Sequence, residues 1–226
     1  SSLFRPWQMI THLFLHGDFG HILGNMFALW MFGSILENVW GPKRFLLFYI
    51  LCGVGASVIH LLILSYEFVP MAADLLQLSQ MSVSGSPAFN DAVMAYAKAH
   101  NIQLTRILSE NNVSLATPGI RTEIMELLTT YYNKTINTAT LGASGAVFGI
   151  LMAFVYLFPN TYIYIYFLFP IKAKWLGLLY FSYELFFAVR NTAGDNVARW
   201  AHVGGAIVGF VLVYLWSRKE RNSRWN

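Results

Sequence analysis

The stretch TLGASGAVFG, residues 140–149, opens an apolar run that continues as ILMAFVYLF to Phe158. A lone serine, Ser144, stands in it between Gly142-Ala143 and Gly145. Glycines on both sides allow another backbone or a substrate to come close. A serine in the first turn of a helix also has neighbouring N–H groups without intrahelical partners, which can stabilise an oxyanion at its hydroxyl. The stretch therefore predicts a helix that begins at a candidate nucleophile, with small-residue packing between membrane helices as the alternative.

The composition predicts an integral membrane protein of the all-α class. The chain has 226 residues, of which 56% are hydrophobic and only 12% are charged, about half the charged fraction of a soluble domain. Five apolar segments are candidate spans, and some approach the ~20 residues that a bilayer core requires. They are residues 22–36, 45–64, 141–158, 175–189 and 201–216. The single cysteine, Cys52, cannot form an intrachain disulfide, so it is expected to serve packing.

The basic residues near the spans give an orientation. Eight of them fall on one side if the first span runs from outside to inside: Lys43, Arg44, Lys172, Lys174, Arg218, Lys219, Arg221 and Arg224. The positive-inside rule then places the C-terminus in the cytoplasm and the N-terminus outside. This asymmetry explains the net charge of +4. The lipid bilayer is thus an expected partner, and no feature indicates a nucleic acid.

One polar segment interrupts the apolar pattern and suggests a helical extramembrane insertion. Residues 1–66 would hold the first two spans, 67–139 the insertion, 140–217 the last three spans and 218–226 a basic tail. Ser86-Pro87 and Thr117-Pro118 resemble helix starts, which predicts helices at 87–100 and 118–132 and a loop at 81–86. A solvated cap without chemistry is the favoured interpretation, and a lid that contacts substrate is the alternative. The aromatic segment 159–170 is expected to be an interfacial connection.

His202 is the second candidate for chemistry within the spans, where ionisable groups are costly and therefore point to function. It opens the last span in WAHVGGAIVGF, and Gly205-x-x-x-Gly209 behind it is a close-approach motif. A serine and its base must come within ~2.6–3.2 Å. Two glycine-lined helix starts on the same side of the membrane would bring Ser144 and His202 together.

A third polar group lies in HLFLHGDFGHILGNMF, residues 12–27. His21 and Asn25 are four residues apart and share a helix face, and the amide of asparagine is a donor suited to an oxyanion hole. His12 and His16 precede them. A metal site built from the three histidines is the rival interpretation, but no H-E-x-x-H occurs and no carboxylate completes the set within a span. No metal or cofactor is therefore predicted.

Taken in order, these elements resemble the rhomboid family of intramembrane serine proteases. The matching residues are His21-x-x-x-Asn25, Gly142-x-Ser144-Gly145, and Ala201-His202 with Gly205-x-x-x-Gly209. The chain is similar to bacterial members in particular. The resemblance implies a helical bundle of six spans, of which five are visible here and the first is missing.

The family's roles then fall on specific residues. The resemblance implies that Ser144 is the nucleophile and His202 the general base, a dyad without aspartate. The oxyanion hole would consist of His21, Asn25 and the backbone N–H of Ser144. Residues expected to support the site or give access to it are Gly142, Gly145, Phe148, Gly205 and Gly209. Residues 190–200 would form a flap over the site, and Glu37 resembles a structural glutamate of the family.

The sequence departs from the family pattern in three further places. Trp7-Gln8 stands where the family usually has Trp-Arg, and Phe148 stands where it often has a tyrosine that stacks on the histidine. Phe148 can still stack but cannot hydrogen-bond. The insertion occupies a loop that is normally short.

The expected function is cleavage of membrane-protein substrates in or near their transmembrane segments through an acyl-enzyme. A catalytically silent rhomboid-like module that binds membrane proteins is the alternative. A transporter is disfavoured because no inverted repeat is visible. An aspartyl protease is disfavoured because all the aspartates fall in the segments outside the predicted spans: Asp18, Asp74, Asp91 and Asp195. The expected location is a bacterial cytoplasmic membrane with the active site open to the outer side, and no oligomeric state is predicted.

Overall fold

The computed structural model describes residues 5–115, 117, 119–137, 142–165, 168–190 and 198–223. The chain divides into two compact units. Residues 63–139 form what we call the insertion unit, and residues 4–62, 140–192 and 196–226 the bundle unit. The predicted domain limits at 66/67 and 139/140 stay a prediction.

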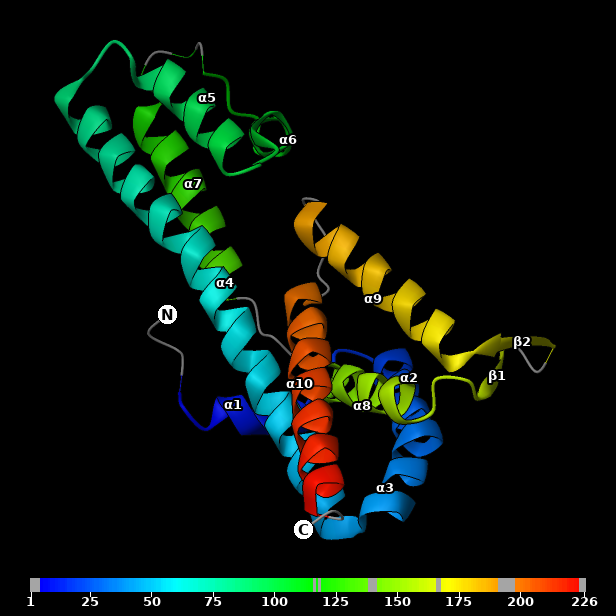
Figure 1. The fold of residues 1–226 in the computed structure, drawn as a ribbon. Coiled ribbons are helices and arrows are strands. Elements are labelled where there is room, and N and C mark those ends of the chain that lie inside the picture. Colours follow the sequence, from blue (N-terminus) through cyan, green and yellow to red (C-terminus); the bar gives the residue numbers. More distant parts are fainter. Residues whose placement is uncertain are drawn as a thin grey trace. The chain divides into compact units, whose positions relative to one another are not determined.

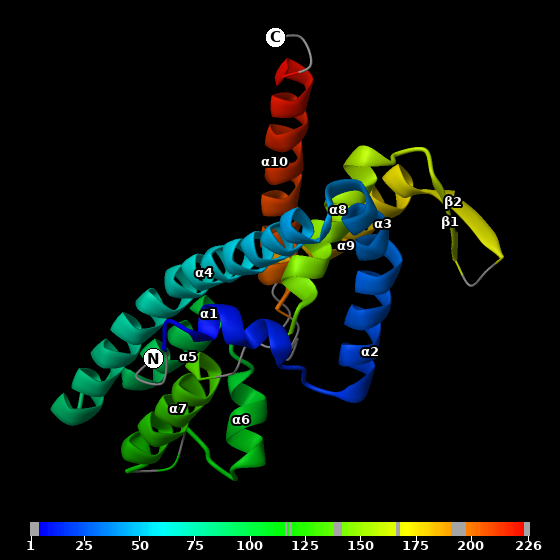
Figure 2. The same ribbon diagram turned by 90° about the horizontal axis from the view of Figure 1, so that it is seen from below.

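The bundle unit is mostly helical (Figures 1 and 2). A helical run leads from α2 (Phe19–Ala28) through the π-helix η2 (Leu29–Gly33) to α3 (Ser34–Trp40), and α4 (Pro42–Ser84) follows after Gly41. Its other elements are α1 (Gln8–Thr11), η1 (His12–Phe14), α8 (Ser144–Leu157), β1 (Tyr162–Ile165), β2 (Phe169–Lys172), α9 (Ala173–Arg190) and α10 (Arg199–Ser223). These elements surround one apolar core in which α8 is almost wholly buried.

Glycines bring the backbones of α8 and α10 into contact, and the two helices lie side by side in both ribbon views (Figures 1 and 2). A Cβ added at Gly209 would stand 2.5 Å from the Cα of Gly149, and one added at Gly205 would overlap the carbonyl oxygen of Gly145. The motif predicted on α10, Gly205-x-x-x-Gly209, thus meets a matching Gly145-x-x-x-Gly149 on α8. Close backbone approach of this kind is how small residues join membrane helices. Cys52 is buried against Gly149, as expected for a packing thiol.

Three helices of the described part are long and apolar enough to cross a membrane: Phe19–Trp40, Pro42–Ser84 and Arg199–Arg221. They contain the predicted spans 22–36, 45–64 and 201–216. The other two predicted spans coincide with α8, which is a shorter apolar helix, and with α9. The chain is therefore a helical membrane protein, and the number of five spans stays a prediction.

The segment predicted as an interfacial connection contains a short β-hairpin, which the all-α prediction did not include. β1 and β2 pair antiparallel, with Tyr162 opposite Lys172 and Ile165 opposite Phe169. Aromatic and β-branched residues dominate YIYI, and such residues favour strands. The secondary structure of the described chain is otherwise helical, in line with the all-α class.

The insertion unit is helical, but its helices begin and end elsewhere than predicted. It contains the later part of α4 together with α5 (Phe89–Ala99), α6 (Leu104–Glu110) and α7 (Arg121–Ile136). The loop predicted at 81–86 begins only after Ser84, because Gly85 takes a φ of +72° and ends α4. The predicted start at Pro87 lies two residues before α5. Pro118 lies outside the described residues, and Gly119 with φ +78° precedes α7, so that helix cannot begin at 118.

Candidate active site

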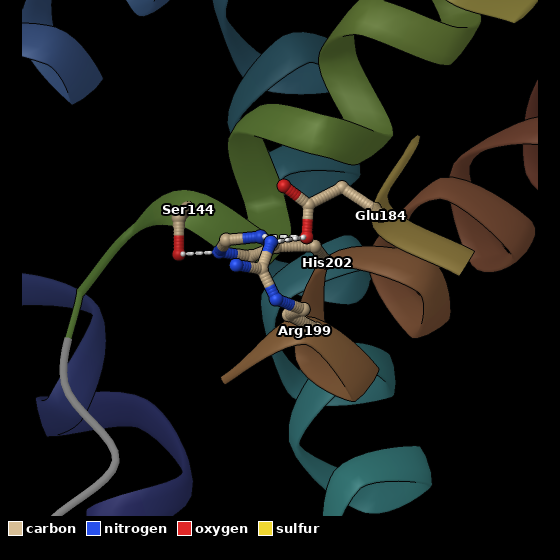
Figure 3. Close-up of polar contacts among 4 residues, drawn as sticks. All are labelled: Ser144, Glu184, Arg199 and His202. Carbon is tan, nitrogen blue, oxygen red and sulfur yellow. Dashed lines mark hydrogen bonds and ion pairs between the residues drawn. The ribbon is translucent and has the colours of Figure 1, made fainter. Parts of the chain in front are cut away.

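Ser144 and His202 meet at the start of their helices. Ser144 is the first residue of α8, and His202 lies in the first turn of α10. The Ser144 Oγ and His202 Nε2 atoms are 2.8 Å apart and form a hydrogen bond (Figure 3). This distance is within the range that a nucleophile and its general base need.

A carboxylate, Glu184 of α9, stands on the far side of the His202 ring (Figure 3). Its side chain is only 6% exposed, and its Oε2 atom is 3.1 Å from His202 Nδ1. An ionised carboxylate can only accept hydrogen bonds, so Nδ1 must carry the proton that is donated. In the neutral imidazole, Nε2 is then the acceptor. The Ser144 hydroxyl therefore donates to His202, and the arrangement is ready for proton transfer in that direction.

Arg199 supplies the positive charge that a buried carboxylate requires. Its Nη1 atom lies 3.3 Å from Glu184 Oε2. The guanidinium also lies over the rings of Tyr183, at 5.6 Å, and Phe187, at 5.1 Å. An isolated buried charge is very costly, whereas a paired and hydrogen-bonded one is tolerated. Arg199 thus compensates the burial of the Glu184 carboxylate next to His202.

Aromatic rings fix the plane of the His202 imidazole. Phe148, one turn after Ser144, stacks on His202 with ring centroids 4.4 Å apart and an interplanar angle of 11°. Phe148 also stacks on Tyr180, with ring centroids 5.3 Å apart and an interplanar angle of 8°. The ring that replaces the family's tyrosine therefore still holds the histidine by stacking.

Hydrogen-bond donors gather beside the backbone that precedes Ser144. Gly142 has φ +108°, and a Cβ there would stand 2.7 Å from His21 Nε2. His21 Nδ1 accepts a hydrogen bond from the Gly17 N–H, at 3.4 Å, so the proton of the neutral ring is on Nε2 and faces Gly142. Asn25 is buried, and its Nδ2 atom has no hydrogen-bond partner among the described residues. These two donors and the free N–H groups of the first turn of α8 suit a developing oxyanion.

His12 holds the segment before Ser144. Its carbonyl accepts the Gly142 N–H at 3.0 Å, and its Nε2 atom lies 3.1 Å from Ser57 Oγ. Burial lowers the pKa of the His12 imidazole. His16 packs edge-on against His21. No cluster of three or more His, Cys, Asp or Glu side chains suited to a metal occurs in the described part of the chain.

Most of the predicted site residues come together, and one important neighbour was missed. Ser144, His202, His21 and Asn25 lie within the bundle unit around Gly142, whereas Glu37 is exposed on α3. Residues 191–197 of the predicted flap lie outside the described residues. Arg190 ends α9, and Arg199 and Trp200 belong to α10, so the ends of the predicted segment are helical and the flap itself stays a prediction. Glu184 was not among the predicted residues, although an ionisable group in the middle of a predicted span is a signal for function.

The rhomboid domain family matches this chain over residues 4–73 and 113–219. The match covers well over half of the sequence, and the chain belongs to the rhomboid family. It omits residues 74–112, which lie inside the insertion. No solved structure matches the chain.

Several rhomboid proteins are similar to the chain. RHOMBOID-like protein 12, a mitochondrial protein of Arabidopsis thaliana, is 29% identical over 95% of this chain and 46% of its own length. A mitochondrial rhomboid protein of Schizosaccharomyces pombe is 28% identical over 96% of this chain and 53% of its own length. The rhomboid protease GluP of Bacillus subtilis is 36% identical, but over only 23% of this chain. The chain thus spans about half the length of the relatives that it matches throughout, and these are mitochondrial, which does not support the predicted bacterial type.

Proposed function

We propose that this chain is a serine endopeptidase that cleaves membrane proteins, with Ser144 as nucleophile and His202 as general base. The observation that carries the proposal is the 2.8 Å hydrogen bond between Ser144 Oγ and His202 Nε2, in a chain of the rhomboid family. A serine is a weak nucleophile until an adjacent base takes its proton. The tautomer fixed by Glu184 gives His202 that capacity.

The reaction proceeds in two steps, acylation of Ser144 and hydrolysis of the acyl-enzyme. Ser144 Oγ attacks the scissile carbonyl carbon while its proton passes to His202 Nε2, which creates a tetrahedral oxyanion and an imidazolium. The intermediate collapses, the C–N bond breaks, and the imidazolium gives its proton to the leaving amine. Water then repeats the sequence on the acyl-enzyme, with His202 as base and then acid, and releases the carboxylic acid.

The oxyanion of each tetrahedral intermediate would be bound by three donors. These are the backbone N–H of Ser144, the Nε2–H of His21 and the Nδ2–H of Asn25. Asn25 supports this role because its buried Nδ2 atom has no hydrogen-bond partner among the described residues, so this donor has no existing hydrogen bond to break. Loss of one such donor typically lowers kcat by about 10²–10³-fold.

The substrate class follows from the depth of the nucleophile. A helix of 14 residues is only ~21 Å long, less than the ~30 Å of a hydrocarbon core. Ser144 at its N-terminus is therefore expected below the membrane surface. A peptide bond reaches it when the substrate helix unwinds, which favours segments that are weak helix formers.

The location is part of the same proposal. Two relatives that match along most of the chain are mitochondrial, so we favour a mitochondrial membrane over the bacterial membrane expected from the sequence. We retain five spans, an insertion at 67–139 outside the bilayer, and a basic tail on the side opposite the active site. The positive-inside rule supports this orientation.

Labelling with a fluorophosphonate serine probe in detergent tests the proposal. We expect the wild type to form an adduct that mass spectrometry locates at Ser144, whereas Ser144→Ala and His202→Ala stay unlabelled. Ser182→Ala is the matched control, because Ser182 is an exposed serine of α9, and it should label like the wild type. A folded wild-type protein without any adduct would overturn the proposal and favour a silent binding module.

A further inference from the structure

Glu184 lies behind the proposed base in a geometry that the dyad does not require. The atoms Ser144 Oγ, His202 Nε2, His202 Nδ1 and Glu184 Oε2 form a continuous chain, with contacts of 2.8 and 3.1 Å at its two ends (Figure 3). Three different helices supply its members. We infer that Glu184 is a positioning residue that holds His202 in its reactive tautomer and stabilises the imidazolium formed during catalysis. This inference rests on the proposed roles of Ser144 and His202.

The first function of Glu184 would be to select the tautomer. A free imidazole places its proton on either ring nitrogen. The carboxylate accepts from Nδ1, and the lone pair of Nε2 is then left for the Ser144 hydroxyl. Without the acceptor at Nδ1, part of the histidine population would carry its proton on Nε2 and could not act as a base.

The second function concerns charge. When His202 takes the serine proton, a positive ring forms whose Nδ1 atom lies 3.1 Å from the carboxylate of the buried Glu184. An anion at hydrogen-bond distance stabilises that cation strongly in a low-dielectric environment. The proton stays on His202, because the carboxylate orients the ring and is not itself protonated.

Arg199 compensates the buried charge of Glu184 and also weakens the effect of that charge on His202. Its guanidinium pairs with the same Oε2 atom that His202 contacts. The pair compensates the burial of the Glu184 carboxylate, but Arg199 also shares its negative charge with His202. We therefore expect a smaller effect of Glu184 than the ~10⁴-fold loss known for the carboxylate of the chymotrypsin-type triad.

A purely structural role is the competing explanation, in which Glu184 only ties α9 to α10 through Arg199. The two roles differ in the pH profile of Ser144 labelling. Removing the charge of Glu184 removes the anion that stabilises the imidazolium. The acid limb of the profile, where the labelling rate falls because the base is protonated, should therefore move to lower pH. The other titratable groups near His202 in the described part of the chain stay in place in such a variant, although Tyr180 and Arg199 also interact with Glu184: His21, His60, Tyr180 and Arg199. A merely loosened site would lower the rate at every pH without moving the limb.

The experiment compares the rate of fluorophosphonate labelling against pH in the wild type, Glu184→Gln and Glu184→Asp. Glu184→Gln keeps the shape and removes the charge, and we expect at least a tenfold lower plateau and an acid limb at lower pH. Glu184→Asp keeps the charge, so its limb should stay at the wild-type position while its plateau falls less. Glu126→Gln makes the same chemical change at an exposed position of α7 and should match the wild type.

The outcomes separate this inference from the proposed function. If Glu184→Gln labels at the wild-type rate with the same pH profile, Glu184 has no role in positioning, and Ser144 and His202 keep theirs. If Glu184→Gln lowers the plateau without moving the acid limb, and Glu184→Asp labels no faster than Glu184→Gln, the role of Glu184 is structural. If Glu184→Gln does not fold, Glu184→Asp decides alone. The aspartate side chain is shorter by one methylene group and places its carboxylate farther from His202, so labelling of Glu184→Asp at the wild-type rate would also overturn the inference. A folded wild type that never labels would overturn the proposed function first.

Discussion

Replacing Gly205 by alanine should separate the two helices that carry the reacting groups. The added Cβ would overlap the carbonyl oxygen of Gly145 and lie 2.6 Å from its carbonyl carbon, whereas ordinary carbon contacts are about 3.5–4.0 Å. Both neighbours are backbone atoms, so no side chain can turn away. The helices must move apart by about 1 Å, and a shift of that size at a reacting centre costs about 10²-fold in rate.

The geometry of the pair converts this shift into a measurable loss. Ser144 Oγ and His202 Nε2 are 2.8 Å apart, and an extra 1 Å or so takes them beyond hydrogen-bond reach. We expect Gly205→Ala to lower the fluorophosphonate labelling rate about 10²-fold and to lower the thermal unfolding midpoint. Gly24→Ala is the matched control, because a Cβ at Gly24 meets nothing within 4 Å. Wild-type labelling and unfolding in Gly205→Ala would refute the claim that this contact sets the distance between the reacting groups.

Three further perturbations test other parts of the site. Gly142→Ala forces an alanine into φ +108° and sets its Cβ 2.6 Å from His21 Cε1, so both the labelling rate and the unfolding midpoint should fall; an unchanged rate would remove Gly142 from the oxyanion geometry. Phe148→Leu removes the ring stacked on His202 and should slow labelling at least several-fold while the protein stays folded; equal rates would show that stacking does not orient the base. Burial lowers the pKa of His12 below its ordinary 6.5, so the folded state binds a proton less readily than the unfolded state, and stability is retained above about pH 6.5 and lost as the pH falls through it. His12→Gln should flatten that decline in thermal melts followed by circular dichroism, and a decline as steep as in the wild type would exclude His12 as its source.

The sequence predicted the meeting of Ser144 and His202 because both signals are local. Each residue stands at a glycine-lined helix start, and the two starts were placed on the same side of the membrane. The structure has them 2.8 Å apart, while their catalytic roles stay predictions. The close contact of α8 with α10 could also be anticipated, since Gly205-x-x-x-Gly209 is a packing motif that any observer of the sequence can find.

Glu184 shows what the sequence could not supply. Its position in an apolar segment signals a costly buried charge, but the identity of its partners depends on how α9 is rotated against α10. That rotation results from the packing of many apolar side chains, which carry no specific spacing signal. The predicted helix starts in the insertion were wrong for a related reason. Gly85 and Gly119 adopt positive φ values, and the proline motifs in the sequence do not reveal them.

The ion pair of Glu184 with Arg199 is better explained by chemistry than by stability. Removing two charges from water is costly, and replacing a buried ion pair by apolar residues is often neutral or stabilising. The helix α9 is also packed closely against α8, where a Cβ added at Gly177 would stand 2.6 Å from Val155 Cγ2, so the salt bridge is not needed as its tie to the bundle. What an apolar pair could not do is accept a hydrogen bond from His202 Nδ1–H and leave Nε2 free for the serine. The carboxylate therefore has a reason to be buried at this position, and Arg199 has a reason to accompany it.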